Sequence, residues 1–104
     1  RYDAMFCNDM DAVTKGAFLA KLGGDQWPLT TYGHTACNHD MLHLVPSSYV
    51  LCLQDRILPP AWQEIFAKRF KCERTVSIDA GHQAMITRPH ALAEILRLEA
   101  ISPR

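Results

Sequence analysis

Asp55 and His82 are the two residues whose types and spacing best fit a chemical role. Asp55 follows the apolar run Tyr49–Leu53. His82 follows a second run, Thr75–Ile78, that contains β-branched residues, and a helix-like segment, Pro59–Phe70, lies between the two runs. A carboxylate that orients an imidazole makes up two of the three groups of a nucleophilic catalytic triad. The third group, a nucleophile, has to come from another part of the sequence.

The elements that must position these two side chains follow the order strand, helix, strand. This order predicts a βαβ unit with two parallel strands and a right-handed connection. Ligands bind beyond the carboxyl ends of the strands in such sheets, so Asp55 and His82 are expected to meet on one rim. The predicted fold class is therefore α/β, with strands over about 49–54 and 74–78 and helices over about 9–22, 60–70 and 89–100.

Two of the predicted helices carry more detailed expectations. The helix over 9–22 should begin at a capping carboxylate, either Asp9 or Asp11, and end at the following glycine pair. The helix over 60–70 should present an apolar side to the sheet and a polar side, which includes Gln63, to water. The expected apolar side consists of Ala61, Ile65, Phe66 and Phe70.

Composition favours one small globular domain. The chain has 104 residues, of which 48% are hydrophobic and 21% charged. The basic and acidic residues number 11 each, so charge gives no reason to expect binding to nucleic acid or to a membrane surface. No apolar run approaches the roughly 20 residues that span a bilayer. We expect a cytoplasmic protein with reduced thiols, although the even count leaves disulfides open for Cys7, Cys37, Cys52 and Cys72.

A cluster of histidines supports a different interpretation. His34, Cys37, His39 and His43 fall within ten residues, in a stretch with little periodicity, and form the densest set of metal-ligand types in the chain. The alternative to an enzyme is therefore a small zinc-stabilised or protein-binding module. A zinc site normally combines two ligand clusters, and the other cysteines are not arranged as a Cys-x-x-Cys pair. The main prediction therefore includes no metal and no cofactor.

Two segments resemble the α/β-hydrolase esterases. Val45–Pro59 is similar to the strand and D-x-x-[IL]-P turn that carry the acid of these enzymes, and Ile78–Pro89 is similar to the run around their catalytic histidine. Phe6–Asp9 and Gln26–Thr31 are similar to the lid of the branch that contains bacterial carboxylesterases, plant methylesterases and hydroxynitrile lyases. The resemblance extends over the chain, but only as the C-terminal part of such a protein.

This resemblance implies a serine-type hydrolase of small-molecule carboxylic esters, with Asp55 as the acid and His82 as the base. Residues 1–44 would belong to the lid or cap region, and residues 45–104 to the C-terminal βαβα part of the core. The resemblance also implies that Trp27, Leu29 and Met85 line the acyl or alcohol pocket. The resemblance implies that lyase chemistry needs a lysine or another positive group near the leaving nitrile. Lyase chemistry ranks lower because Lys68 and Lys71 are expected to face solvent.

The sequence departs from the family at the nucleophile. These enzymes carry serine in a G-x-S-x-G elbow upstream of the lid, whereas no glycine pair brackets Ser47, Ser48, Ser77 or Ser102 here. We therefore expect the nucleophile-bearing part to be missing or to lie on a separate polypeptide, and the chain alone to be inactive. The chain should pack against that complementary polypeptide or associate with itself. An inactive truncated fragment is the remaining alternative.

Overall fold

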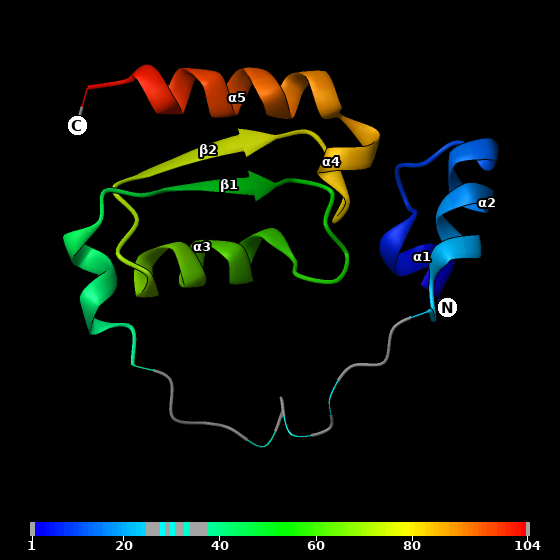
Figure 1. Cartoon of the computed structure of the whole chain (residues 1–104), viewed down its shortest axis with the longest axis horizontal. Helices are drawn as coiled ribbons and strands as arrows, with labels where there is room; N and C mark the ends of the chain where they lie inside the picture. Colours follow the sequence, from blue (N-terminus) through cyan, green and yellow to red (C-terminus); the bar gives the residue numbers. More distant parts are fainter. Residues whose placement is uncertain (1, 25–27, 29, 31–32, 34–37, 104) are drawn as a thin grey trace.

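A two-stranded parallel sheet with helices on both sides forms the centre of the computed structural model (Figure 1). The structure describes residues 2–24, 28, 30, 33 and 38–103. Strand β1 spans Ser48–Cys52, helix α3 spans Pro60–Arg69, and strand β2 spans Arg74–Ile78. The strand register places the first residues of β1 and β2 opposite each other, and likewise their last residues. The α/β class and the strand, helix, strand order are confirmed.

The first strand lies slightly earlier in the sequence than predicted. It begins at Ser48 and ends at Cys52 rather than at residue 54. Leu53 and Gln54 still donate backbone hydrogen bonds towards the second strand, to the carbonyls of Ile78 (3.0 Å) and Ala80 (2.9 Å). Both residues already lie in a turn, because the partner strand ends at Ile78 and offers no further extended backbone.

Helices α3 and α5 (Pro89–Ile101) flank the two strands, with α3 next to β1 and α5 next to β2 (Figure 1). Each begins with proline in its first turn, where a missing N–H costs no helical hydrogen bond. The predicted helices over 60–70 and 89–100 are thus confirmed to within one residue. The hydrophobic core consists of Ile78, Ala80 and Ala84, with Val50, Cys52, Leu92 and Ile95 packed against them.

The N-terminal part holds two helices, α1 (Tyr2–Phe6) and α2 (Ala12–Lys21), beside the carboxyl ends of the strands (Figure 1). Of the two capping carboxylates predicted for the helix over about 9–22, Asp11 is confirmed, so the helix begins at Ala12, three residues later than predicted. Asp11 is its N-cap, with the carboxylate accepting from the Thr14 N–H at 2.7 Å, whereas Asp9 makes its hydrogen bonds elsewhere. Helix α1 and the short helices η2 (Asp40–Leu44) and α4 (Ala84–Thr87) were not predicted, because segments of four or five residues are too short to show helical periodicity.

The buried side of α3 also differs from the prediction. Gln63 was expected to face water but is 2% exposed, and Ala67 is buried beside it, whereas Ala61 and Ile65 are exposed. The Gln63 amide donates to the carbonyls of Cys52 (2.9 Å) and Leu58 (2.7 Å) and accepts from the Cys52 N–H (2.8 Å). Its hydrogen bonds to the strand backbone, rather than its hydrophobicity, account for this burial.

Gln63 therefore occupies the outer edge of β1 at its carboxyl end. Successive residues of a strand direct their backbone groups to opposite sides. Since Leu53 donates to β2, the N–H and C=O of Cys52 point away from it, and the Gln63 amide binds both groups. This side chain thus ends the open edge of the strand and links it to the start of α3.

Replacing Gln63 with Leu is expected to lower the free energy of unfolding by about 1–3 kcal/mol. Leucine has a similar volume but leaves partly buried backbone groups of Cys52 and Leu58 without the Gln63 amide as partner. Urea denaturation followed by circular dichroism measures the change. The neighbouring exposed substitution Glu64→Gln serves as control and should have little effect. A Gln63→Leu variant as stable as the unmodified chain would contradict the structural role of the amide.

Cys7, Cys52 and Cys72 are free thiols, while Cys37 lies outside the described residues. Cys7 is the largest fully buried side chain among the described residues, with an exposed fraction of 1%. Burial, followed by the nearby charge of Asp3, raises the pKa of the Cys7 thiol above its ordinary value of 9.0. Burial also raises the pKa of Cys52.

Stability is therefore expected to fall in alkaline solution. Between the pKa of the unfolded thiol and the higher pKa of the folded thiol, the folded chain binds more protons, so the free energy of unfolding decreases as pH rises. Denaturation at about pH 8 and about pH 10 measures this slope. The Cys7→Ala variant lacks one of the buried thiols and should show a shallower slope. An equal slope in both proteins would exclude Cys7 as a contributor.

Among the described residues, no helix combines the length and the apolar character that a membrane span requires.

Candidate active site

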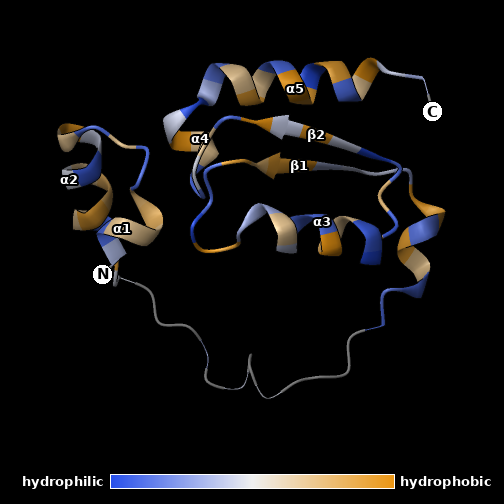
Figure 2. Cartoon of the chain, turned by 180° about the vertical axis from the view of Figure 1, so that it is seen from behind, coloured by the Kyte–Doolittle hydropathy of each residue, from blue (hydrophilic) through white to orange (hydrophobic). Residues whose placement is uncertain are grey.

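Asp55 and His82 meet beyond the carboxyl ends of the two strands, as the sequence predicts. Asp55 lies three residues past the end of β1, and His82 lies four residues past the end of β2. The Asp55 Oδ2 and the His82 Nδ1 are 2.8 Å apart. In this region apolar strand ends are followed by hydrophilic turns (Figure 2). The parallel pairing of the strands brings together two side chains that are 27 positions apart in the chain.

The Asp55 carboxylate is held by its own turn. Its residue is 7% exposed, and its second oxygen, Oδ1, accepts from the backbone N–H groups of Ile57 (2.8 Å) and Leu58 (2.9 Å). Asp55 is therefore both a turn-forming residue and the partner of His82. These two bonds leave Oδ2 directed at the imidazole, with little freedom for the carboxyl group to rotate.

The contact with Asp55 also indicates which ring nitrogen of His82 carries a proton. An ionised carboxylate only accepts hydrogen bonds, so His82 donates to Asp55 through Nδ1–H. In the neutral ring Nε2 is then the acceptor, which is the form that a general base needs. The His82 side chain is 34% exposed, whereas that of Asp55 is 5% exposed. The pair thus combines a buried, fixed acid with an imidazole that a reacting group can reach.

Phe6, at the end of α1, packs against the imidazole. The ring centroids of Phe6 and His82 are 5.9 Å apart, and the rings meet edge to face at 74°. The N-terminal helix therefore contributes one wall of the His82 environment. The sequence resemblance placed Phe6 in a lid segment, but it did not predict this contact.

The segment after Phe6 contacts the turns that carry both residues of the pair. Asp9 Oδ2 accepts from the Gly81 N–H and from the Thr87 hydroxyl, each at 2.7 Å. Asn8 Nδ2 donates to the Gln54 carbonyl at 2.8 Å. From the sequence, Asp9 is a candidate helix cap and Asn8 and Asp9 belong to the lid-like segment, and neither expectation includes these bonds. No local pattern could have revealed these bonds, because their partners are 46 to 78 positions away.

The two turns are also joined directly. The Gln54 side-chain amide donates to Asp79 Oδ1 at 2.6 Å. Gln54 precedes Asp55, and Asp79 follows the end of β2. The turn that carries Asp55 and the turn that carries His82 are thus joined by a second side-chain hydrogen bond besides the Asp55–His82 contact.

The predicted substrate-binding residues are only partly placed. Met85 lies on α4, three residues beyond His82, and is 59% exposed. Trp27 and Leu29 lie outside the described residues. Of the three, the structure therefore describes only Met85, and the predicted pocket remains a prediction.

The histidine cluster is also described in part. His39 packs edge to face against Phe70, with centroids 5.2 Å apart, and His43 Nδ1 is hydrogen-bonded to the Asp40 carbonyl. His34 and Cys37 lie outside the described residues. Within the part of the chain that the structure describes, no three His, Cys, Asp or Glu side chains are grouped so that they could hold a metal ion.

Two serine hydroxyls have hydrogen-bond partners far from the rim. Ser48, at the start of β1, donates to Glu99, and Ser102 donates to the Leu98 carbonyl at the end of α5. Both positions lie away from the carboxyl ends of the strands. These two serines therefore do not supply the nucleophile for His82.

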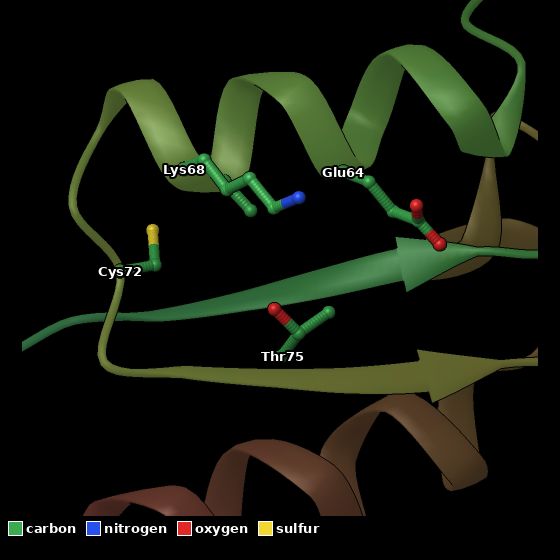
Figure 3. Close-up of a pocket in the computed structure, with 5 residues that line it drawn as sticks. Glu64, Lys68, Cys72 and Thr75 are labelled. Atoms are coloured by element: carbon green, nitrogen blue, oxygen red, sulfur yellow. The ribbon is translucent and has the colours of Figure 1, made fainter.

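A pocket with a volume of about 260 Å³ lies between α3 and the sheet, lined by Glu64, Ala67, Lys68, Cys72 and Thr75 (Figure 3). Cys72 precedes β2, whereas Glu64 lies near the carboxyl end of β1, so the pocket follows the length of the strands (Figure 3). Neither Asp55 nor His82 is among its lining residues.

Comparison of the chain with protein-family models, with curated proteins and with solved structures finds no match.

Proposed function

We propose that this chain supplies the acid and the base of a serine-type carboxylic ester hydrolase of the α/β-hydrolase class. The observation that carries this proposal is the 2.8 Å contact between Asp55 Oδ2 and His82 Nδ1 at the carboxyl ends of adjacent parallel strands. The order in the chain, acid after one strand and histidine after the next, is the order of that class. Residues 45–104 then form the C-terminal part of the core, and residues 1–44 belong to its lid or cap.

In the proposed reaction, His82 Nε2 takes the proton of a serine hydroxyl while the serine oxygen attacks the ester carbonyl carbon. The resulting imidazolium is stabilised by Asp55, whose carboxylate is already oriented by two backbone N–H groups. His82 then gives the proton to the departing alcohol as the acyl–oxygen bond breaks. Water then attacks the acyl-enzyme by the same steps, and the carboxylic acid is released. Met85, exposed on α4 three residues beyond His82, is proposed to contact the substrate.

The nucleophile is proposed to come from a complementary polypeptide or from a further segment of a longer protein. Large apolar side chains on the β1 side of the fold support such a partner. Leu53 is 49% exposed, Trp62 is 53% exposed and Ile65 is 41% exposed. Among the described residues β1 pairs only with β2, so the side of β1 away from β2, beyond the Gln63 contact, could accept a further strand. A covering chain at this edge would bury these side chains and place its own strand beside Asp55.

Native mass spectrometry combined with labelling by a serine-reactive fluorophosphonate tests the proposal. We expect a complex heavier than the 11.8 kDa chain by a second polypeptide, with the label on a serine of that polypeptide. His82→Ala should slow labelling by about 10²–10⁴-fold, because the serine loses its base. His90→Ala is the matched control, since His90 is an exposed histidine on α5.

Other outcomes of this experiment contradict the proposal. A single chain that carries one equivalent of zinc and unfolds on chelation would identify the histidine cluster as the functional centre. A homo-oligomer that contains only this chain and does not react with the phosphonate would identify a truncated fragment. Equal labelling of the unmodified complex and the His82→Ala complex would show that His82 is not the base.

A further inference from the structure

We propose that Asn8 and Asp9 are positioning residues that hold the Asp55 turn and the His82 turn in the geometry required for proton transfer. This inference rests on the function proposed above and assigns to the N-terminal segment a role in that same site. One carboxylate oxygen of Asp9 links two parts of the segment that carries His82. Asp9 Oδ2 accepts from the Gly81 N–H, one residue before His82, and from the Thr87 hydroxyl, five residues after it.

These two bonds fix the segment around His82 at both ends. Gly81 is buried, and His82 follows it directly in the turn that leaves β2. Thr87 is the last residue of α4, the short helix that begins two residues after His82. A shift of either end would rotate the imidazole away from Asp55 Oδ2, because the ring is connected to the backbone through only two torsions.

Asn8 acts on the acid side of the site. Its Nδ2 donates to the carbonyl of Gln54, the residue immediately before Asp55. Adjacent residues of one N-terminal segment therefore hold the acid turn and the base turn at the same time. The distance between Asp55 and His82 is then determined by a third segment, in addition to the pairing of the strands.

Close packing at Gly81 supports this assignment. A Cβ atom added at Gly81 would lie 2.5 Å from Asp9 Oδ1 and 2.8 Å from Asn8 Oδ1. Both oxygens are buried and have no hydrogen-bond partner among the described residues. Burying such atoms is unfavourable unless the same side chains make compensating contacts. Those contacts are the bonds to Gly81, Thr87 and Gln54.

Phe6 completes the contact between the N-terminal segment and the site. It packs edge to face on His82, and Cys7, the next residue, is 1% exposed. The burial of Cys7 anchors the backbone from which Asn8 and Asp9 extend. The segment can therefore act as a rigid support for the two turns.

Nuclear magnetic resonance of the 104-residue chain tests the inference without requiring a nucleophile. The readout is the His82 Nδ1 proton, for which we expect a separate low-field signal and slow exchange with water while Asp55 holds it. We expect the Asp9→Ala variant to lose this signal under conditions in which the variant is still folded. We expect Asp9→Asn to retain it, because the amide oxygen can accept both bonds. Retention of the signal in Asp9→Ala, or its loss in Asp9→Asn, would overturn the proposal.

Asp11→Ala is the matched control. Asp11 lies two residues from Asp9 and caps α2, but its carboxylate accepts from Thr14 rather than from the His82 segment. Its removal should lower the melting temperature and leave the His82 signal unchanged. Loss of the signal in this variant would show that general loosening of the N-terminal segment, and not the Asp9 bonds, moves the imidazole.

A second variant is available if Asp9→Ala does not fold. Thr87→Val removes one of the two Asp9 bonds and keeps the side-chain volume. Faster exchange of the His82 proton in this variant would support the proposal, and unchanged exchange would overturn it.

The signal reports the Asp55–His82 pair whether or not an ester is hydrolysed. Loss of the signal in Asp9→Ala without any esterase complex would therefore reject the hydrolase and keep the positioning role. Conversely, an active esterase complex combined with an unaffected signal in Asp9→Ala would keep the hydrolase and reject the positioning role.

Discussion

Replacing Asp55 with Asn is expected to lower ester turnover by the proposed complex on the order of 10⁴-fold while leaving the fold intact. The amide oxygen of asparagine can still accept from the N–H groups of Ile57 and Leu58, so the turn is preserved. The amide NH₂ then faces His82 where Oδ2 stood, and it can only donate. Nδ1 must become the acceptor, which moves the ring proton to Nε2 and removes the lone pair that takes the serine proton.

This expectation can be checked at two levels. Steady-state kinetics of the complex should show the loss in kcat, and nitrogen chemical shifts of His82 in the isolated chain should show the change of tautomer. Asp79→Asn is the control, because Asp79 is an exposed carboxylate of the same rim that contacts Gln54 rather than His82. Unchanged kcat in Asp55→Asn would remove Asp55 from the mechanism.

Replacing Gly81 with Ala is expected to destabilise the chain by about 1–3 kcal/mol. The added Cβ would lie 2.5 Å from Asp9 Oδ1 and 2.9 Å from Asp9 Cγ, far inside van der Waals contact. Either the His82 turn or the N-terminal segment must move, and the Gly81–Asp9 hydrogen bond is then weakened. In a domain of this size each kcal/mol lowers the melting temperature by about 4–8 °C, which differential scanning calorimetry resolves.

Gly16→Ala is the matched control for this substitution. Gly16 lies inside α2, and no heavy atom of the described residues lies within 4 Å of the Cβ that alanine would add, the helix's own nearby backbone aside. Alanine has the higher helix propensity, so this variant should gain about 0.5–1 kcal/mol. Opposite signs for the two glycine substitutions are the expected result. A Gly81→Ala variant as stable as the unmodified chain would contradict the close packing of Asp9 on the His82 turn.

The sequence by itself determined the βαβ unit and the meeting of its two polar turns. Alternation between apolar runs and turn residues is a local property, so the strands around Val50 and Val76 and the helix between them could be predicted. Because the carboxyl ends of parallel strands lie at one edge of a sheet, Asp55 and His82 could be predicted to meet there, and they do. Proline at the start of α3 and α5 located those helices to within a residue.

The tertiary structure alone decided what holds the two turns in place. Asp9 and Asp11 are the same residue type two positions apart, yet Asp11 caps a helix and Asp9 binds the His82 segment. Gln63 is polar and buried because a strand edge needs its amide. The side chains of Asp9 and Gln63 are each placed by backbone groups outside their own elements, between 5 and 72 positions away. Local propensity contains no information about such partners, because hydrogen bonds between distant segments form only when the whole chain has packed.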